Sequence, residues 1–453
     1  MSTARVADDT APAMRLGRWP LAIIAISLAA VALPLLRPAG PGNTGGVDLA
    51  VVAAMLATAA WASARLHALR LPYATPVALM VLAGALAATV SGVSGGGGAH
   101  SLLALAQDVF VFAWSAAVAT LGQDRAALDV FCRAWAYSAI AWAGLLVFAA
   151  LAGIDWLSGV NTADGIRASF TLGDPNLAAG YFTCGLLVMR ATRRPRRTGW
   201  RWLACALVLT AIVLTLSNGG MLALLVASVL GGLFTLARRR GIAAAAAVGA
   251  VLALGAGTVV ATVDVRGWVA RVEESSPLVR DSLGRESESG GSRAALTAES
   301  LTLWLRGDAV LGHGPGSTSA VLEARQAPYV KEAHDDYLAA IVERGVLGGF
   351  ALVLLAAAVA VRCRRISAPG GTAPEHRDIV PRPELLAAAV VAVAISGVFY
   401  EVLHFRHVWA LFGLVAALEF AGRGPAFARR RPESARPRPE FAGRRPDLAG
   451  RQP

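Results

Sequence analysis

The chain has 453 residues, of which 56% are hydrophobic and 16% charged, and its mean hydropathy is +0.55. This balance excludes a soluble globular protein of the same length. The formal net charge is +12. The basic residues gather between apolar runs and in the C-terminal tail, a pattern that argues against a nucleic-acid-binding protein.

Apolar runs of roughly 17–25 residues recur along the chain, each long enough to cross about 30 Å of hydrocarbon. We therefore expect an all-α, polytopic membrane protein with about twelve transmembrane helices and one large extracytoplasmic, partly helical loop. The expected spans lie near residues 19–36, 47–64, 72–91, 101–121, 129–152, 175–190, 199–216, 219–237, 241–263, 346–362, 384–402 and 407–421.

Five segments follow from this pattern. Residues 1–18 form a polar lead before a signal anchor, and 19–263 contain about nine spans. Residues 264–345 form the large loop, where candidate catalytic residues lie, and 346–421 contain about three more spans. The Pro- and Arg-rich tail, 422–453, is expected to be disordered.

Positively charged residues lie in every second connection between the spans. The arginines there include Arg65, Arg70, Arg125, Arg190, Arg193, Arg194, Arg196, Arg197, Arg201, Arg238–Arg240, Arg362, Arg364 and Arg365. Because basic connections stay inside, this distribution predicts a multi-pass protein of the plasma membrane with both termini in the cytoplasm.

That orientation brings four polar segments to the outer face. They are the loop 153–174, the Ser217–Gly220 turn, the loop 264–345 and the connection Glu401–His407. Polar groups that converge at one face of a membrane are what an extracytoplasmic active site requires.

His334 is the sharpest catalytic candidate. An imidazole at the outer surface can act as a general base toward a hydroxyl, although a histidine at a helix start can also simply bond locally. Asp335 and Asp336 could orient it, but capping of the helix that follows is the favoured interpretation. Upstream, the spacing from Arg293 predicts a helix with an apolar stripe of Ala294, Leu301, Trp304 and Leu305.

Arg167 and Arg293 are candidates for binding a phosphate or pyrophosphate, because guanidinium groups bind phosphoryl oxygens bidentately. The alternative is an interfacial arginine that reaches for water. Asp174-Pro175-Asn176 is typical of a helix cap, or it aims a helix N-terminus at an anion. Ser217–Gly220 is a tight turn, or a nest of backbone N–H groups.

Two other kinds of site are disfavoured. The Gly312–Gly316 run lacks the lysine of a nucleotide-binding P-loop, and we expect His313 within it to be structural. Glu401, His404 and His407 do not have the spacing of a metal site. We expect neither a metal nor a cofactor.

Four motifs appear in the order seen in one family of bacterial envelope enzymes. They are Arg167 with Phe170, Asp174–Asn176 and Ala178; the Ser217–Gly220 turn; Arg293 with Trp304 and Gly312–Gly316; and His334–Leu338 followed by Glu343, Gly345 and Gly348. Over roughly residues 160–420 the chain resembles the O-antigen ligase and O-antigen polymerase superfamily.

The resemblance implies a metal-independent and nucleotide-independent glycosyltransferase. Its donor would be an undecaprenyl-pyrophosphate-linked glycan, and its acceptor a hydroxyl of a glycan, a lipid or a protein. His334 would activate the acceptor, while Arg167 and Arg293 would neutralise the pyrophosphate. Asn176, Ser217 and Asp335 would support them.

One position departs from the family pattern. The family turn usually reads Ser-Arg-Gly, and this chain has Asn218 where the arginine would stand. Arg325 or Lys331 could supply the missing cation, or activity could be lost or redirected. Two alternatives therefore stay open: a lipid-linked oligosaccharide flippase and an inactive assembly scaffold. A flippase predicts ionisable residues along a path through the spans, and few are seen.

Overall fold

The computed structural model describes residues 20–37, 44–64, 68–93, 98–160, 166–262, 264, 267, 294–307, 309–324, 326 and 335–423. These residues form helices and connections without a β-strand, which confirms the all-α prediction. The first ten helices are α1 (Pro20–Ala32), α2 (Gly46–Ala64), α3 (Ala74–Val93), α4 (Gly98–Leu121), α5 (Arg125–Leu151), α6 (Asp155–Ser158), α7 (Pro175–Ala191), α8 (Thr198–Leu214), α9 (Asn218–Arg240) and α10 (Ile242–Thr262).

The second half adds a helix over residues 294–306 and then α13 (Thr318–Ala324), α14 (Asp336–Ser367), α15 (Pro374–Arg377), α16 (Glu384–Phe399) and α17 (Arg406–Gly422). Six helices of the described chain, α2, α4, α5, α9, α10 and α14, are long and apolar enough to cross a membrane. Shorter apolar helices include α1, α3, α8 and α16. The count of about twelve spans stays a prediction.

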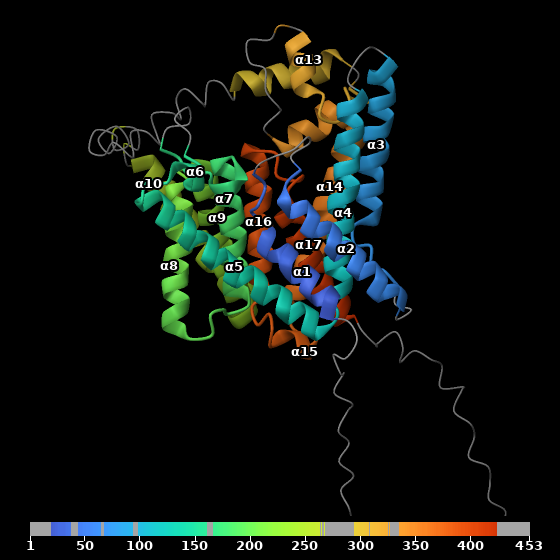
Figure 1. Ribbon diagram of the computed structural model, residues 1–453. Coiled ribbons are helices and arrows are strands. Elements are labelled where there is room, and N and C mark those ends of the chain that lie inside the picture. The colour runs from blue at the N-terminus through green and yellow to red at the C-terminus, as the bar shows by residue number, and fades with distance from the viewer. Residues whose placement is uncertain are drawn as a thin grey trace, which may run out of the picture.

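Helix α17 lies inside the bundle and is buried along nearly its whole length (Figure 1). It packs on α4, while α16 packs on α9 and α3 packs on α14. Small residues permit these approaches: a Cβ added at Gly413 would come within 2.7 Å of the Val118 Cβ. The Ala- and Gly-rich composition therefore produces close helix packing, as small residues do between membrane helices.

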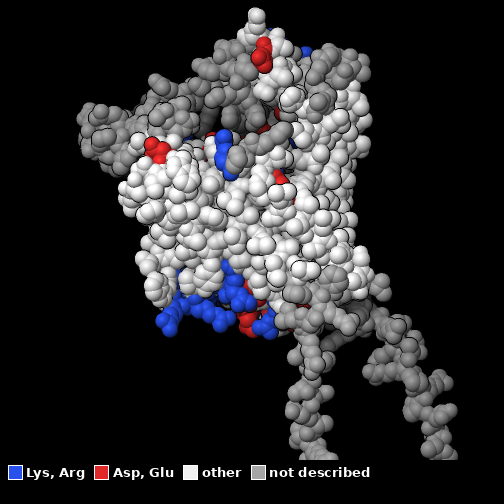
Figure 2. Space-filling model, in the orientation of Figure 1, with Lys and Arg blue, Asp and Glu red and all other residues white. Residues whose placement is uncertain are grey.

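The bundle has two different ends. Arginines gather at the end that carries α15 and the start of α8, which we call the basic end (Figure 2). The other end carries the helix 294–306, α13 and the start of α14, and we call it the loop end. The separation matches the charge pattern along the sequence, but the side on which each end lies stays a prediction.

A small second core stabilises the loop end. It contains Leu296, Leu303, Leu322, Leu338 and Val342, from the helix 294–306, α13 and α14. Of the predicted stripe on the first of these helices, Trp304 packs against this core, but the other predicted residues do not. Leu301 and Leu305 are 41% and 64% exposed, whereas Leu296 and Leu303 are buried. The helix has apolar residues on several of its faces. The spacing of these residues alone therefore does not predict which face packs on the core.

The glycine run of the loop end packs on a kink in α14. Gly345 has φ 62°, a left-handed conformation, and a Cβ there would overlap the backbone of Val310. Beside it, His313 N and Gly314 N donate to the carbonyl oxygens of Val342 (3.0 Å) and Glu343 (2.9 Å). The Nε2 of His313 lies 3.1 Å from the Leu303 carbonyl oxygen, which supports its structural role. Glycine is needed where two backbones approach so closely.

Candidate active site

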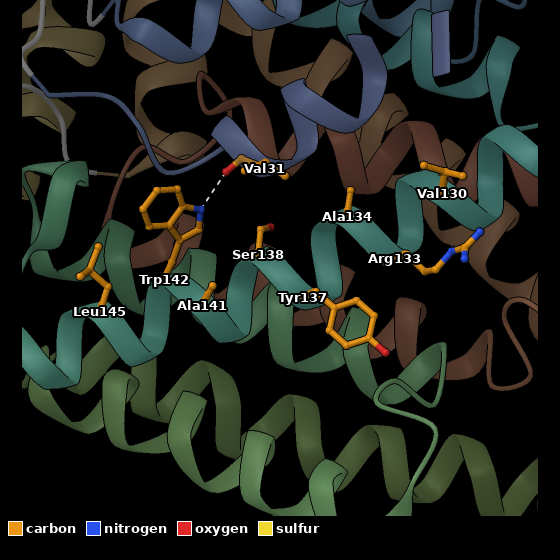
Figure 3. A pocket seen from close by; sticks show the side chains of 9 residues that line it. All are labelled: Val31, Val130, Arg133, Ala134, Tyr137, Ser138, Ala141, Trp142 and Leu145. Atoms are coloured by element: carbon orange, nitrogen blue, oxygen red, sulfur yellow. Dashed lines mark hydrogen bonds between the residues drawn. The ribbon is translucent and has the colours of Figure 1, made fainter. Parts of the chain in front are cut away.

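An open groove along α5 carries little chemistry. It has a volume of about 830 Å³ and lies along α5 beside α1, with mostly apolar walls (Figure 3). Trp142 Nε1 donates to the Val31 carbonyl oxygen at 2.8 Å across it. Its charged residue, Arg133, pairs with Asp129 at 2.6 Å. A groove of this kind suits hydrocarbon, and the polar chemistry lies elsewhere.

A polar cavity of about 360 Å³ opens at the loop end, among α3, α4, α14 and the connection before α17. Figure 2 shows the surface hollowed near this end, with acidic side chains inside. The polar and charged residues that line it are His100, Gln107, Asp108, Asp336, Glu343, Arg344, Glu401 and His404. Trp409 and Met80 add apolar surface.

The carboxylates of this cavity are held by defined donors. Arg344 pairs with Asp108 at 2.7 Å, and Glu343 accepts from Gly316 N and from the Thr318 hydroxyl, both at 2.8 Å. Buried charges require such partners, because an unpaired one costs several kcal/mol (of order 3–5). The fixed side chains give the cavity a stable shape.

Asp335 and Asp336 have separate roles. Asp335 caps α14 by accepting from Tyr337 N at 2.7 Å and Leu338 N at 3.1 Å, as predicted, and burial raises the pKa of its carboxyl. For Asp336 the capping interpretation was wrong. Its carboxylate reaches the connection between α16 and α17, where it accepts from Val402 N at 3.0 Å and Leu403 N at 3.2 Å.

Three predicted site residues, His334, Arg293 and Arg325, lie outside the described residues, as does Lys331. His334 directly precedes the Asp335 cap and stands two positions before the cavity residue Asp336. The assignment of His334 as the catalytic base therefore stays a prediction.

Arg167, Asn176 and Ser217 form a second polar group at the loop end, as predicted from their separate segments. The Nη2 of Arg167 donates to Asn176 Oδ1 at 3.3 Å, and the Ser217 hydroxyl donates to the same oxygen at 2.7 Å. Arg167 Nε also donates to the Thr215 carbonyl oxygen at 3.3 Å. We call these three residues the Arg167 cluster.

Helix caps hold the Arg167 cluster in place. Asp174 caps α7 by accepting from Asn176 N at 2.7 Å and Leu177 N at 3.2 Å, with Pro175 at the first turn. Ser217 caps α9 by accepting from Gly220 N at 3.0 Å. Both motifs thus have the capping and turn geometry that the sequence favoured. Asn218 is the first residue of α9.

Arg37 is a cation that sequence reasoning missed. Its backbone N–H donates to the Thr171 carbonyl oxygen at 2.8 Å, and its guanidinium lies against Gly173, next to the Asp174 cap. Arg37 lies in a connection that is otherwise poor in arginine. That exception to the charge pattern could have identified it as a candidate cation. Within the described chain, Arg37 and Arg167 both lie near the start of α7.

The C-terminal end of α16 connects the cluster to the cavity. A Cβ at Gly219, beside Ser217, would come within 3.0 Å of the Phe399 ring. A Cβ at Gly397 would come within 2.8 Å of Asp336 Oδ2. The cationic cluster and the acidic cavity therefore flank the last turn of α16.

The histidines near α17 do not assemble a metal site. His407 packs against the Tyr181 ring with centroids 5.8 Å apart, whereas His404 lines the cavity. Burial, followed by the charge of Arg406, lowers the pKa of His404 to about 3. Within the described part of the chain, no three His, Cys, Asp or Glu side chains cluster as metal ligands do.

One known family matches part of the chain. Residues 203–353, about a third of the chain, match the family model described as O-Antigen ligase. This match supports membership of the O-antigen ligase superfamily. The matched segment contains the Ser217 turn, the helix 294–306 and the cavity residues of α14; Arg167 lies before it. A comparison with curated proteins finds no match.

Sequence reasoning missed several residues of the cavity. Asp108 lies within the expected span 101–121 and Arg344 lies just before the span 346–362. The two residues are paired only when α4 and α14 are brought together. An acid within an apolar span was the signal that could have found Asp108. Nothing in the sequence pairs it with a residue 236 positions away.

Proposed function

We propose that this chain is a membrane glycosyltransferase that transfers a glycan from undecaprenyl pyrophosphate to an acceptor hydroxyl at the outer face of the plasma membrane. The observation that carries the proposal is the O-antigen ligase match over the segment that supplies the Ser217 turn and the α14 wall of the cavity. The acceptor would be a glycan, a lipid or a protein, and the surrounding bilayer presents the lipid-linked donor.

The two polar regions suit two parts of this reaction. The Arg167 cluster would hold the donor pyrophosphate, with Arg293 and Arg37 as further cations. The cavity carries Asp108, Asp336, Glu343 and Glu401 against Arg344, so its excess of carboxylates would repel a pyrophosphate. Hydroxyl groups of a sugar can instead donate hydrogen bonds to carboxylates.

In the proposed step, the acceptor hydroxyl gives its proton to His334 as its oxygen bonds to the anomeric carbon of the donor. The bond between that carbon and the pyrophosphate oxygen breaks, and undecaprenyl pyrophosphate leaves with the electron pair. Arg167 and Arg293 stabilise the negative charge that grows on the leaving group. Preplaced cations are most effective where charge develops in the transition state.

Asn218 would make this donor site less cationic than in relatives with arginine at that turn. Arg37, whose guanidinium lies near the start of α7, would offset the difference. The proposal thus favours an active enzyme over an inactive scaffold.

The test uses a strain that lacks the gene, complemented with the wild type or with Arg167→Gln. The variant should lose surface glycan by about 10²-fold or more, the scale seen when one group that stabilises a developing charge is removed. Lipid-linked donor should accumulate on the outer leaflet.

Arg306→Gln is the matched control, because Arg306 is exposed at the same end of the molecule. It should retain surface glycan. Donor that accumulates on the inner leaflet in the Arg167 variant would contradict transfer and indicate a flippase.

A further inference from the structure

Four arginines converge on a pocket at the basic end, far from the groups proposed for glycan transfer. The pocket has a volume of about 300 Å³ and is lined by Arg190, Arg193, Arg201 and Arg382, with Thr198, Trp202 and Cys205. They come from the end of α7, the start of α8 and the segment before α16. Arg382 N bonds the Ala191 carbonyl oxygen at 3.1 Å, which ties the two sides together.

The pocket has no acidic side chain in its lining. Glu384, the nearby acid, is bound by Arg238 at 2.6 Å instead. Arg382 Nε is buried with no hydrogen-bond partner among the described residues. Burial and the neighbouring arginines Arg193, Arg239 and Arg190 lower the pKa of Arg382, and Glu384 offsets this only in part. Such a pocket is complementary to a phosphate.

An apolar groove continues from this pocket between the helices. It has a volume of about 460 Å³ and shares Arg190, Trp202, Cys205 and Arg382 with the pocket. Its remaining walls come from α7, α8, α9 and α16 and are mostly apolar, including Leu187, Leu209, Leu224, Gly232 and Leu385. The pocket and the groove therefore form one continuous surface, cationic at one end and apolar along its length.

Arginines at one end of membrane helices ordinarily set orientation and reach separately into water. Here they share one pocket, one of their buried N–H groups lacks a partner, and an apolar groove begins beside them. We propose that this surface binds one anionic glycerophospholipid of the surrounding leaflet. Its phosphate would lie among the four arginines and one acyl chain in the groove. The proposal is independent of the glycosyltransferase assignment.

The test measures lipid binding to the purified full-length chain in neutral detergent by native mass spectrometry, with phosphatidylglycerol as the probe. Phosphatidylglycerol should bind at least about 10-fold more tightly than phosphatidylcholine. Its headgroup has a net negative charge, whereas the choline cation of phosphatidylcholine would be repelled by the four arginines. Arg382→Gln should abolish most of that preference. Arg364→Gln is the control, because Arg364 is exposed outside the pocket.

A second pair of variants tests the groove. A Cβ at Gly232 meets no atom within 4 Å, so Gly232→Leu should fold while its side chain fills the groove. It should weaken phosphatidylglycerol binding about 10-fold. Gly255→Leu, on α10 with the same open space, should not.

Three results would overturn the proposal. Equal binding of phosphatidylcholine and phosphatidylglycerol would remove the role of the arginines. Competition by inorganic phosphate as effective as that by phosphatidylglycerol would indicate a simple anion site without a chain. Undecaprenyl phosphate binding in place of phosphatidylglycerol would assign the site to a different lipid.

Discussion

Single residues at the loop end are fixed by contacts with distant parts of the chain. Glu343 binds the glycine run, Asp336 binds the connection before α17, and Arg344 binds Asp108. Each contact satisfies a buried charged or polar group that would otherwise be costly. The charged residues of α14 thus fix the walls of the cavity. The kink at Gly345 sets the direction of the rest of α14.

Gly345→Ala should therefore destabilise the protein. Its φ of 62° disfavours any side chain, and a Cβ would overlap Val310, at a cost of about 1–3 kcal/mol or more. Thermal unfolding in detergent should show a lower midpoint. Gly255→Ala, where a Cβ meets open space in a helix, should match or exceed the wild type. Equal midpoints for the two variants would contradict the role of the kink.

His404 should make stability depend on pH. Its pKa is lowered to about 3 in the folded chain, against an ordinary value of 6.5. Between these values the unfolded chain binds a proton that the folded chain does not, so stability falls as pH drops from about 6.5 toward 3. His404→Gln should lose less of its thermal midpoint between pH 7 and pH 5 than the wild type. An unchanged pH dependence would show that His404 is not the buried neutral group described.

At the scale of elements, local signals predicted the all-α class and three helix caps. Asp174, Ser217 and Asp335 cap α7, α9 and α14, because a short polar side chain before an apolar run acts within its own helix. Signals failed where the partner lies elsewhere in the chain. Asp336 binds a connection 66 positions away. The helix 294–306 docks mainly by Leu296 and Leu303, and Trp304 alone of its predicted stripe packs beside them.

The candidate site shows the same division. The bonds among Arg167, Asn176 and Ser217 agree with the convergence expected from topology. The cavity was foreseen only in part. The connection Glu401–His407 was expected to approach the large loop, but Asp108 and Arg344 gain significance only when α4 and α14 meet. The spacing of residues within one segment does not predict which distant helices pack together.

At the scale of the whole molecule, the proposed reaction requires the loop end to face the outside of the plasma membrane. Cysteine labelling can test it, because the four native cysteines are buried. Glu323→Cys on α13 and Glu375→Cys on α15 place exposed thiols at opposite ends. A membrane-impermeant maleimide should label the first in intact cells and the second only after permeabilisation, since basic connections stay inside. The reverse pattern would refute an outer active site.

The central claim is that His334 starts glycan transfer at the loop end. The most direct measurement is transfer from an undecaprenyl-pyrophosphate-linked glycan by the purified chain, comparing the wild type with His334→Ala and with His313→Ala. Loss of a general base should reduce the rate about 10²–10⁴-fold at saturating donor. His313→Ala, which changes a structural contact at Leu303, should retain the rate once adjusted for folded protein. Full transfer by His334→Ala would contradict the account.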